Sequence, residues 1–290
     1  MVSVGAIFRP QLPPERLGDV ALAADDAGLD ELWLWEDCFL ESGVATASAA
    51  LARTSRLRVG VGVLPVPLRN VALTAMEAAT LHRLFPGRVI LGAGHGVQDW
   101  MAQVGARAES PLTLMREYLG ALRALLRGEE VTSRGRYVTL DRVALGWPPL
   151  TAAPVLAGAS GPKSLRLAGE CADGTILTAG TTPDGVRRAR LLIDEGRSAA
   201  GRTDPHDLVV NLHTATGPDA ATRLRAELHH WYGKDDPELG VAGDGATVAE
   251  AVRRLADAGA GTVVLQPTPD EPDPEGFVRF AAEEVAPRLR

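Results

Sequence analysis

Short apolar runs alternate along the chain with longer segments whose apolar residues recur at helical spacing. Eight runs are rich in β-branched or other apolar residues: Val2–Phe8, Glu31–Glu36, Arg58–Leu64, Arg88–Gly92, Pro154–Ala157, Gly174–Thr178, Leu208–Ala215 and Thr262–Gln266. This alternation is typical of parallel βα units. Because eight such units close into a barrel, the pattern predicts an α/β fold, a (β/α)8 TIM barrel with insertions, formed by residues 1–290 as one domain.

The segments between the predicted strands carry the apolar stripes of amphipathic helices. One stripe covers Leu17–Ala27 and another Leu112–Leu126, and each is followed by a glycine that would end a helix. Thr247 and Glu250 have the spacing of a capping box, which predicts a helix start at Thr247.

Two stretches interrupt the alternation. Arg134–Pro149 has the pattern of a short hairpin, and His229–Gly245 is polar, rich in glycine and carries Trp231 and Tyr232. Loops of this length often act as lids or contact surfaces, although solvated excursions are as common. We expect Trp231 and Tyr232, with Trp100 and Trp147, to line a substrate pocket; the alternative for each is a place in the core or in a dimer contact.

Charge and composition exclude several classes of partner. The chain has 30 basic and 37 acidic residues, a formal charge of −7, and its basic residues are scattered, which argues against nucleic acid and acidic membranes. No apolar run approaches the roughly 18 residues that span a bilayer, and the first residues lack the features of a signal peptide. We therefore expect a cytoplasmic protein whose two cysteines are thiols.

Reactive side chains follow the second predicted strand. Active sites of parallel βα barrels lie at the carboxyl ends of the strands. There Glu36, Asp37 and Cys38 place two carboxylates and a thiol together. A helix cap or an arginine pair would explain Asp37 alone, but three adjacent polar groups favour a catalytic role.

The fourth strand leads into a glycine-rich turn, Gly92–Gln98, that carries His95. Alternate glycines let the backbone approach a ligand closely, and an imidazole exchanges protons near neutral pH. The turn lacks the rest of the dinucleotide fingerprint, so it does not predict a Rossmann fold.

The fifth strand ends in Gly158–Ser164, followed by a helical pattern. Free backbone N–H groups, a hydroxyl and a helix N-terminus at one point favour an anion such as a phosphate. An ordinary serine cap is the plainer interpretation, but the sixth strand also ends in hydroxyls, Thr178 among them.

Two kinds of chemistry lack support. The six histidines form no metal-ligand cluster with cysteine or carboxylate, and His229 with His230 fits a surface helix better. No G-x-S-x-G elbow marks a serine hydrolase.

At these residues the sequence resembles the bacterial-luciferase-like superfamily, and within it the coenzyme F420-dependent reductases and dehydrogenases akin to methylenetetrahydromethanopterin reductase. The resemblance covers essentially the whole chain. It rests on the order and spacing of LWLWEDCF, VGVGVLPVPLRNVALTAMEAATL, GRVILGAGHGVQDWMAQVGA, PVLAGASGPKSLRLAGECADGTIL and AEEVAPRL. It implies a barrel, commonly a homodimer, that holds a flavin or deazaflavin at the strand ends.

The resemblance also implies roles for individual residues. Asp37 matches an acidic residue beside the cofactor ring, and the bond between Gly62 and Val63, often a non-prolyl cis peptide, backs the central ring. Further matches are Gln98 near the ring and, around the phosphate, Ala159, Ser160, Gly161, Leu177 and Thr178.

The sequence departs from the family pattern at the proton-handling positions. Cys38 stands where many deazaflavin enzymes have His, His95 where relatives often carry an acid, and Asn70 replaces a frequent His. These departures suggest a changed substrate or proton donor. The expected reaction is hydride transfer between reduced F420 and a small imine, enone or activated alkene, with Cys38 or His95 as proton donor tuned by Glu36 and Asp37.

Three alternatives remain open from the sequence. A flavin mononucleotide (FMN)-dependent monooxygenase with a flavin reductase partner would use the same phosphate loop. A flavin- or deazaflavin-binding protein without turnover is the second. A different phosphate-binding barrel, such as an isomerase or aldolase, is disfavoured because only Lys163 stands at a strand end.

Overall fold

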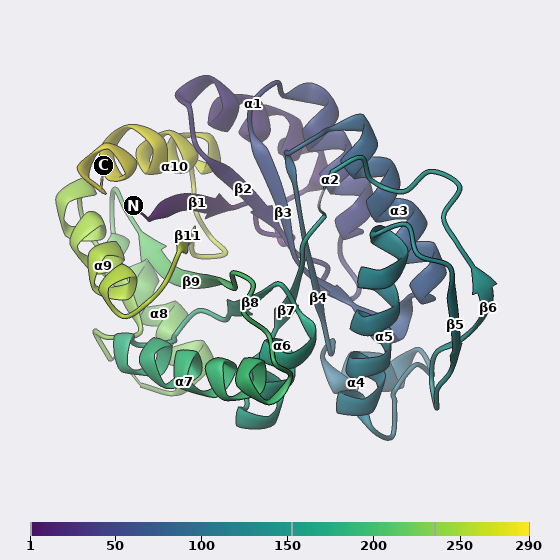
Figure 1. The fold of residues 1–290 in the computed structure, drawn as a ribbon. Coiled ribbons are helices and arrows are strands. Elements are labelled where there is room, and N and C mark those ends of the chain that lie inside the picture. The colour runs from purple at the N-terminus through teal and green to yellow at the C-terminus, as the bar shows by residue number, and fades with distance from the viewer. Residues whose placement is uncertain (1, 152, 235, 290) are drawn as a thin grey trace.

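Eight parallel strands of the computed structural model close into a barrel surrounded by helices (Figure 1). The structure describes residues 2–151, 153–234 and 236–289. The strands, in their order around the barrel, are β1 (Ser3–Ile7), β2 (Glu31–Leu34), β3 (Arg58–Pro65), β4 (Val89–Gly94), β7 (Val155–Gly158), β8 (Gly174–Leu177), β9 (Asp207–Ala215) and β11 (Thr262–Gln266). Since β11 pairs in parallel with β1, the sheet is closed, and all eight predicted strands are confirmed.

Helices cover the outside of the barrel. They are α1 (Leu17–Ala27), α2 (Gly43–Arg53), α3 (Val71–Leu84), α4 (Gln98–Gln103), α5 (Pro111–Leu126), α6 (Pro162–Cys171), α7 (Pro183–Ala199), α8 (Ala220–Tyr232), α9 (Gly245–Asp257) and α10 (Pro274–Phe280). The predicted end of α1 is confirmed, since Gly28 follows it with φ +77°, a conformation that glycine adopts without steric cost.

The barrel has two hydrophobic layers. The layer between sheet and helices is built from alanine, valine and leucine, and the interior of the barrel is filled by a separate cluster that includes Trp33, Ile90 and Ile176. Trp33 needs glycines around it, because a Cβ at Gly60 would lie 2.5 Å from its ring. The interior is therefore a packed core, and a ligand has room only beyond the strand ends.

Three local predictions differ from the structure. Helix α9 starts earlier than Thr247, because Asp244 is the N-cap and its Oδ1 accepts hydrogen bonds from the backbone N–H (2.9 Å) and hydroxyl (2.7 Å) of Thr247. The hairpin consists of β5 (Val131–Arg134) and β6 (Thr139–Val143), so it begins before residue 134.

The stretch expected to be an irregular insertion after residue 229 begins inside a helix. Residues 229–232 form the last turn of α8, and a short strand, β10 (Gly240–Ala242), then pairs with β9. Charged side chains mask the helical pattern, but the prediction that His229 and His230 belong to a surface helix is confirmed.

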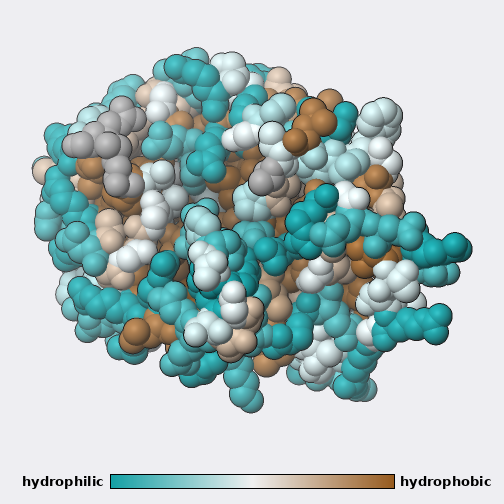
Figure 2. Space-filling view, in the orientation of Figure 1, coloured by the Kyte–Doolittle hydropathy of each residue, from teal (hydrophilic) through white to brown (hydrophobic). Residues whose placement is uncertain are grey.

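The surface is mostly polar. Figure 2 shows hydrophilic residues over most of one face, with hydrophobic groups in separate patches. Among the described residues, no helix combines the length and apolar character needed to cross a bilayer.

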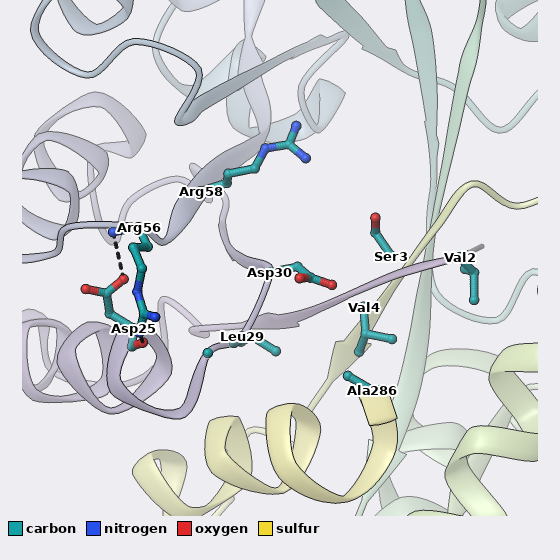
Figure 3. A pocket seen from close by; sticks show the side chains of 10 residues that line it. Val2, Ser3, Val4, Asp25, Leu29, Asp30, Arg56, Arg58 and Ala286 are labelled. Carbon is teal, nitrogen blue, oxygen red and sulfur yellow. Dashed lines mark hydrogen bonds between the residues drawn. The ribbon is translucent and has the colours of Figure 1, made fainter. Parts of the chain in front are cut away.

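A cavity of about 450 Å³ lies at the amino ends of β1, β2 and β3 (Figure 3). Its wall includes Asp25, whose carboxylate accepts hydrogen bonds from the backbone N–H groups of Ser55 (2.8 Å), Arg56 (2.9 Å) and Leu57 (2.7 Å). These bonds lower the pKa of Asp25 against the opposing effect of burial. The cavity is at the opposite end from the reactive residues, at the face of a barrel that serves stability.

Candidate active site

Val63 forms the floor of the open end of the barrel. Its side chain packs on the barrel core and covers the ends of two strands, β4 and β7. A Cβ added at Gly94 would lie 2.5 Å from it, one at Gly92 3.2 Å and one at Gly158 2.9 Å. The peptide bond between Gly62 and Val63 is cis, as the resemblance implies. The glycines of the β4 turn were expected to let a ligand approach. Gly94 instead makes room for Val63, and Gly92 makes room for Ile176 and the Val61 carbonyl.

The end of β2 presents Asp37 and Cys38 at this floor. Both are partly exposed, and the peptide bond after Cys38 is cis. Burial raises the pKa of the Asp37 carboxyl, against the opposing effects of the Trp35 indole N–H and the Arg9 guanidinium. Burial, together with the nearby charges of Glu36 and Asp37, raises the pKa of the Cys38 thiol. Cys38 is therefore a protonated thiol at neutral pH.

Glu36, expected as a tuning group, acts on Cys38 through its charge alone, because its carboxylate is bound to other groups. Its carboxylate pairs with Arg69 (2.6 Å) and accepts a hydrogen bond from the backbone N–H of Gly43 (2.8 Å), the first residue of α2. Arg69 also pairs with Glu77 of α3 (3.1 Å). The structure thus gives Glu36 a role in fixing the β2 and β3 loops.

A buried ion pair borders the floor on the side of β1. Arg9, just beyond β1, donates to Glu227 of α8 at 2.7 Å, and both side chains are 5% exposed. Glu227 also accepts a hydrogen bond from the indole of Trp231 (3.0 Å), and the Arg9 guanidinium lies 5.7 Å from the ring centre of Trp35. Helix α8 therefore holds Arg9 over the end of β2.

A second network joins α8 to the loop after β8. His213 Nε2 lies 3.1 Å from the hydroxyl of Tyr232, which donates to the carbonyl of Ala179 (2.8 Å), and Gln266 Nε2 lies 3.4 Å from His213 Nδ1. Gln266 donates to Nδ1, so Nε2 carries the proton and donates to Tyr232. Tyr232 thereby fixes the loop that contains Thr178. In this segment Thr178 is exposed and Leu177 is buried.

The anion loop lies where β7 leads into α6. Gly161 is the N-cap of α6 without a side-chain cap, and a Cβ there would meet only open space. Ser160 and Lys163 are exposed, whereas Ala159 is buried with its N–H bonded to the carbonyl of Ile176 (3.2 Å). The first turn of α6 thus offers uncapped N–H groups and an ammonium group to an anion.

His95, the residue after β4, contacts the helix that follows this loop. Its Nε2 lies 3.1 Å from Ser164 Oγ in the first turn of α6, and burial lowers its pKa against the opposing effect of the Pro111 carbonyl. Gln98 donates from its amide to the carbonyl oxygens of His95 (3.2 Å) and Gly96 (3.4 Å). Among the described residues, no hydrogen bond or ion pair joins His95 to Cys38.

The four aromatic residues that were expected to line one pocket lie in different parts of the structure. Trp231 and Tyr232 lie on α8 at the open end, and Trp100 is half-buried on α4. Trp147 is 74% exposed and stacks on Arg83 (5.1 Å) in the last turn of α3, at the other end of the barrel. The prediction for Trp147 is wrong, because the segment after the hairpin returns to the amino ends of the strands.

Two buried histidines make the free energy of unfolding depend on pH. Burial lowers the pKa of His206, which lies 2.8 Å from Thr175 Oγ1, and of His213 to about 4. Unfolding restores the ordinary value near 6.5, so the unfolded state binds more protons below it. Stability is complete above about pH 6.5 and falls towards pH 4, by about 2 kcal/mol for each residue at pH 5.

Urea unfolding at pH 7 and pH 5 measures this loss. His206→Gln should remove about half of it, and an equal unfolding free energy at the two pH values would contradict the assignment.

Four groups at the site were missed in the sequence. Arg9 and Gln266 stand directly at strand ends, so the rule that found Asp37 applies to them as well. His213 is hidden inside the long apolar run of β9. Glu227 lies on a helix, and only the tertiary pairing with Arg9 reveals it.

Comparison with known proteins identifies relatives of this chain. Over 209 residues the chain is 32% identical to 5,10-methylenetetrahydromethanopterin reductase of Methanolobus tindarius, a match that covers 72% of this chain and 63% of the relative. It is 29% identical to F420-dependent glucose-6-phosphate dehydrogenase of Microbacterium testaceum, over 97% of this chain and 95% of the relative.

A solved structure shares the fold over the full length. It is an F420-dependent secondary alcohol dehydrogenase in complex with an F420–acetone adduct, with a TM-score of 0.87 and 22% identity over 100% of this chain and 99% of that one. The luciferase-like monooxygenase family matches residues 4–271. With a closed barrel whose open end combines a glycine-lined floor and an anion loop, the chain belongs to the luciferase-like monooxygenase family.

Proposed function

We propose that this chain is a coenzyme F420-dependent oxidoreductase that transfers a hydride between the reduced deazaflavin and a small organic substrate. The observation that carries the proposal is the pairing of a flat floor at Val63 with an uncapped helix start at Gly161, at the open end of one barrel. A planar ring with a phosphate side chain needs both features. The relatives named as F420-dependent enzymes support the choice of cofactor.

The residues at the floor and the loop fit this cofactor. Val63 and Gly62 would support the ring, with Asp37 at its edge and Gln98 nearby. The phosphate would lie at the anion loop, formed by Ala159, Ser160, Gly161, Leu177 and Thr178. Bound there, the reduced deazaflavin supplies a hydride. The protein's task is to hold the substrate against it and to supply a proton.

Cys38 is the group best suited to supply the proton. It lies at the floor, is partly exposed and carries its proton at neutral pH because its pKa is raised. When the substrate carbon accepts a hydride, the negative charge that develops on the neighbouring atom takes the thiol proton, and Asp37 shapes the field around the thiol. His95, held against Ser164, orients the anion loop.

Anaerobic oxidation of reduced F420 tests the function. A panel of enones, imines, ketones and activated alkenes is offered, and the return of the absorption of the oxidised cofactor is followed. Multiple turnovers with at least one compound are expected. Turnover that requires oxygen, reduced FMN and a flavin reductase would contradict the proposal and establish the monooxygenase alternative.

His95→Ala is expected to weaken F420 binding. Removal of the imidazole frees Ser164 from its 3.1 Å contact, and a lost hydrogen bond of about 1 kcal/mol corresponds to about a fivefold rise in Kd. Fluorescence titration with F420 measures it, with His230→Ala on the exposed side of α8 as control. An unchanged Kd with lower turnover would instead assign proton transfer to His95.

We also propose that two copies of the chain associate through α3. Leu73, Met76 and Leu84 are 46%, 59% and 65% exposed and lie on one face of the helix with Thr80. An apolar helical stripe of this kind is buried when a second copy packs against it. Sedimentation is expected to give twice the 30.6 kDa chain mass.

Met76→Glu should then give the single-chain mass, because it places a charge in the apolar contact. Leu191→Glu on α7, equally exposed, should leave the mass doubled. A wild-type protein that sediments at the single-chain mass would contradict the dimer.

A further inference from the structure

The charges around the floor bear on the substrate. The proposed function puts the cofactor ring against Val63, so the substrate binds above it, between the loops that follow β11, β1, β2 and β3. In these loops, as far as the structure describes them, the cations are Arg9, Arg16 and Arg69. Each of them has a carboxylate partner from another element.

The pairing of Arg9 is the most complete. The contact with Glu227 is buried, and the guanidinium also donates to the Pro267 carbonyl (3.1 Å) and to Gln11 Oε1 (3.0 Å). The carboxylate of Glu227 is fixed in turn by Trp231. The charge of Arg9 is thus neutralised inside the protein before any substrate arrives.

The other two arginines are matched in the same way. Arg69 lies between Glu36 and Glu77, and Arg16 makes a bidentate pair with Glu275 of α10 (2.8 Å and 2.6 Å). On α8, Arg223 pairs with Glu271 from the loop after β11 (2.9 Å). Lys163, which is exposed, lies at the anion loop and would serve the cofactor phosphate.

Two carboxylates near the floor have no such partner. Asp37 makes no ion pair within 4 Å among the described residues, and the positive charge that acts on it, that of Arg9, is paired with Glu227. Glu41, farther along the same loop, has a buried Oε1 without a hydrogen-bond partner, and burial with the charge of Glu15 raises its pKa to about 7. The substrate side of the open end is therefore neutral to negative.

We infer that the substrate carries neither a phosphate nor a carboxylate group and is an uncharged carbonyl or imine compound. An anionic substrate would face Asp37, whereas each described cation of these four loops is already paired with a carboxylate, and like charges a few ångströms apart repel. This inference rests on the proposed function. It separates this chain from the relatives named as glucose-6-phosphate dehydrogenases, whose named substrate is an anion.

The test is a pair of probes that differ in one group, glucose and glucose 6-phosphate. Their binding is measured by calorimetry with F420-saturated protein, or with the protein alone if F420 does not bind. The wild-type protein is expected to bind the phosphate no more tightly than glucose. Tighter binding of the phosphate would overturn the inference, whereas failure of F420 to bind overturns the proposed function instead.

The variant Glu227→Gln tests the same inference in the opposite direction, because it should create a binding site for an anion. The amide keeps the shape of Glu227 but leaves Arg9 with an unmatched charge, so affinity for glucose 6-phosphate is expected to rise about tenfold or more while that for glucose is unchanged. Glu275→Gln, which changes the net charge equally at the more exposed Arg16, should have no such effect. Equal affinities in Glu227→Gln and wild type would count against the inference.

A second experiment compares two substrates of the wild-type protein, so it does not require that the variant folds. The wild-type kcat/KM for a cyclic enone should exceed that for the same enone bearing a carboxylate by about tenfold or more. Equal or reversed values would overturn the inference.

Discussion

Cys38→Ala is expected to lower turnover by about 10²- to 10⁴-fold, the range that a positioned general acid contributes. The thiol lies at the floor beside Asp37, and its raised pKa keeps the proton in place at neutral pH. The F420 dissociation constant should not change, because the anion loop and Val63 are untouched. Steady-state oxidation of reduced F420 and a fluorescence titration give the two quantities.

Cys171→Ala is the matched control, since the chain has two cysteines and this one ends α6, beside Arg116 and Glu170. It should turn over like the wild type. If Cys38→Ala keeps full turnover, another group donates the proton, and Cys38 only lines the floor.

Gly196→Ala should lower the free energy of unfolding by about 3 kcal/mol or more. Helices α6 and α7 cross with their backbones in contact: a Cβ at Gly196 would lie 2.0 Å from the carbonyl oxygen of Arg166, and one at Gly169 2.1 Å from that of Ile193. Backbone atoms cannot rotate away as a flexible side chain can. The two helices must therefore move apart and expose core between them.

Gly120→Ala is the control and should have the opposite sign. Gly120 lies inside α5, is exposed, and has nothing within 4 Å of an added Cβ. Alanine there reduces the conformational entropy of the unfolded chain and has a higher helix propensity than glycine. The free energy of unfolding is therefore expected to rise by about 0.5–1 kcal/mol. Urea unfolding measures both variants, and equal stability of Gly196→Ala and wild type would contradict the close crossing.

The sequence predicts the barrel and the strand ends well, because both depend on local patterns. Buried parallel strands are continuous apolar runs, so the eight strands were found within a few residues of their observed ends. The rule that active sites follow these ends places Asp37 and Cys38 at the floor and Gly161 at the helix start.

The remaining features depend on tertiary contacts that no local pattern encodes. In the sequence, Glu227 is an ordinary polar position of a helix, and only the folded structure shows its pairing with Arg9. In the sequence, Gly94 has the pattern of a ligand contact, but in the structure the side chain of Val63 occupies the space beside it. The start of α9 is different, because it is a local feature: Asp244, three residues before Thr247, is the N-cap.

Cofactor selectivity decides whether this chain uses a deazaflavin. The protein, freed of any bound cofactor, is titrated with oxidised F420 and with FMN, and fluorescence polarisation reports binding. We expect saturable F420 binding that is at least about tenfold tighter than FMN binding, a difference of about 1.4 kcal/mol. Tighter binding of FMN would contradict the deazaflavin assignment, and binding of neither would mean that the chain keeps the barrel of its family without the cofactor.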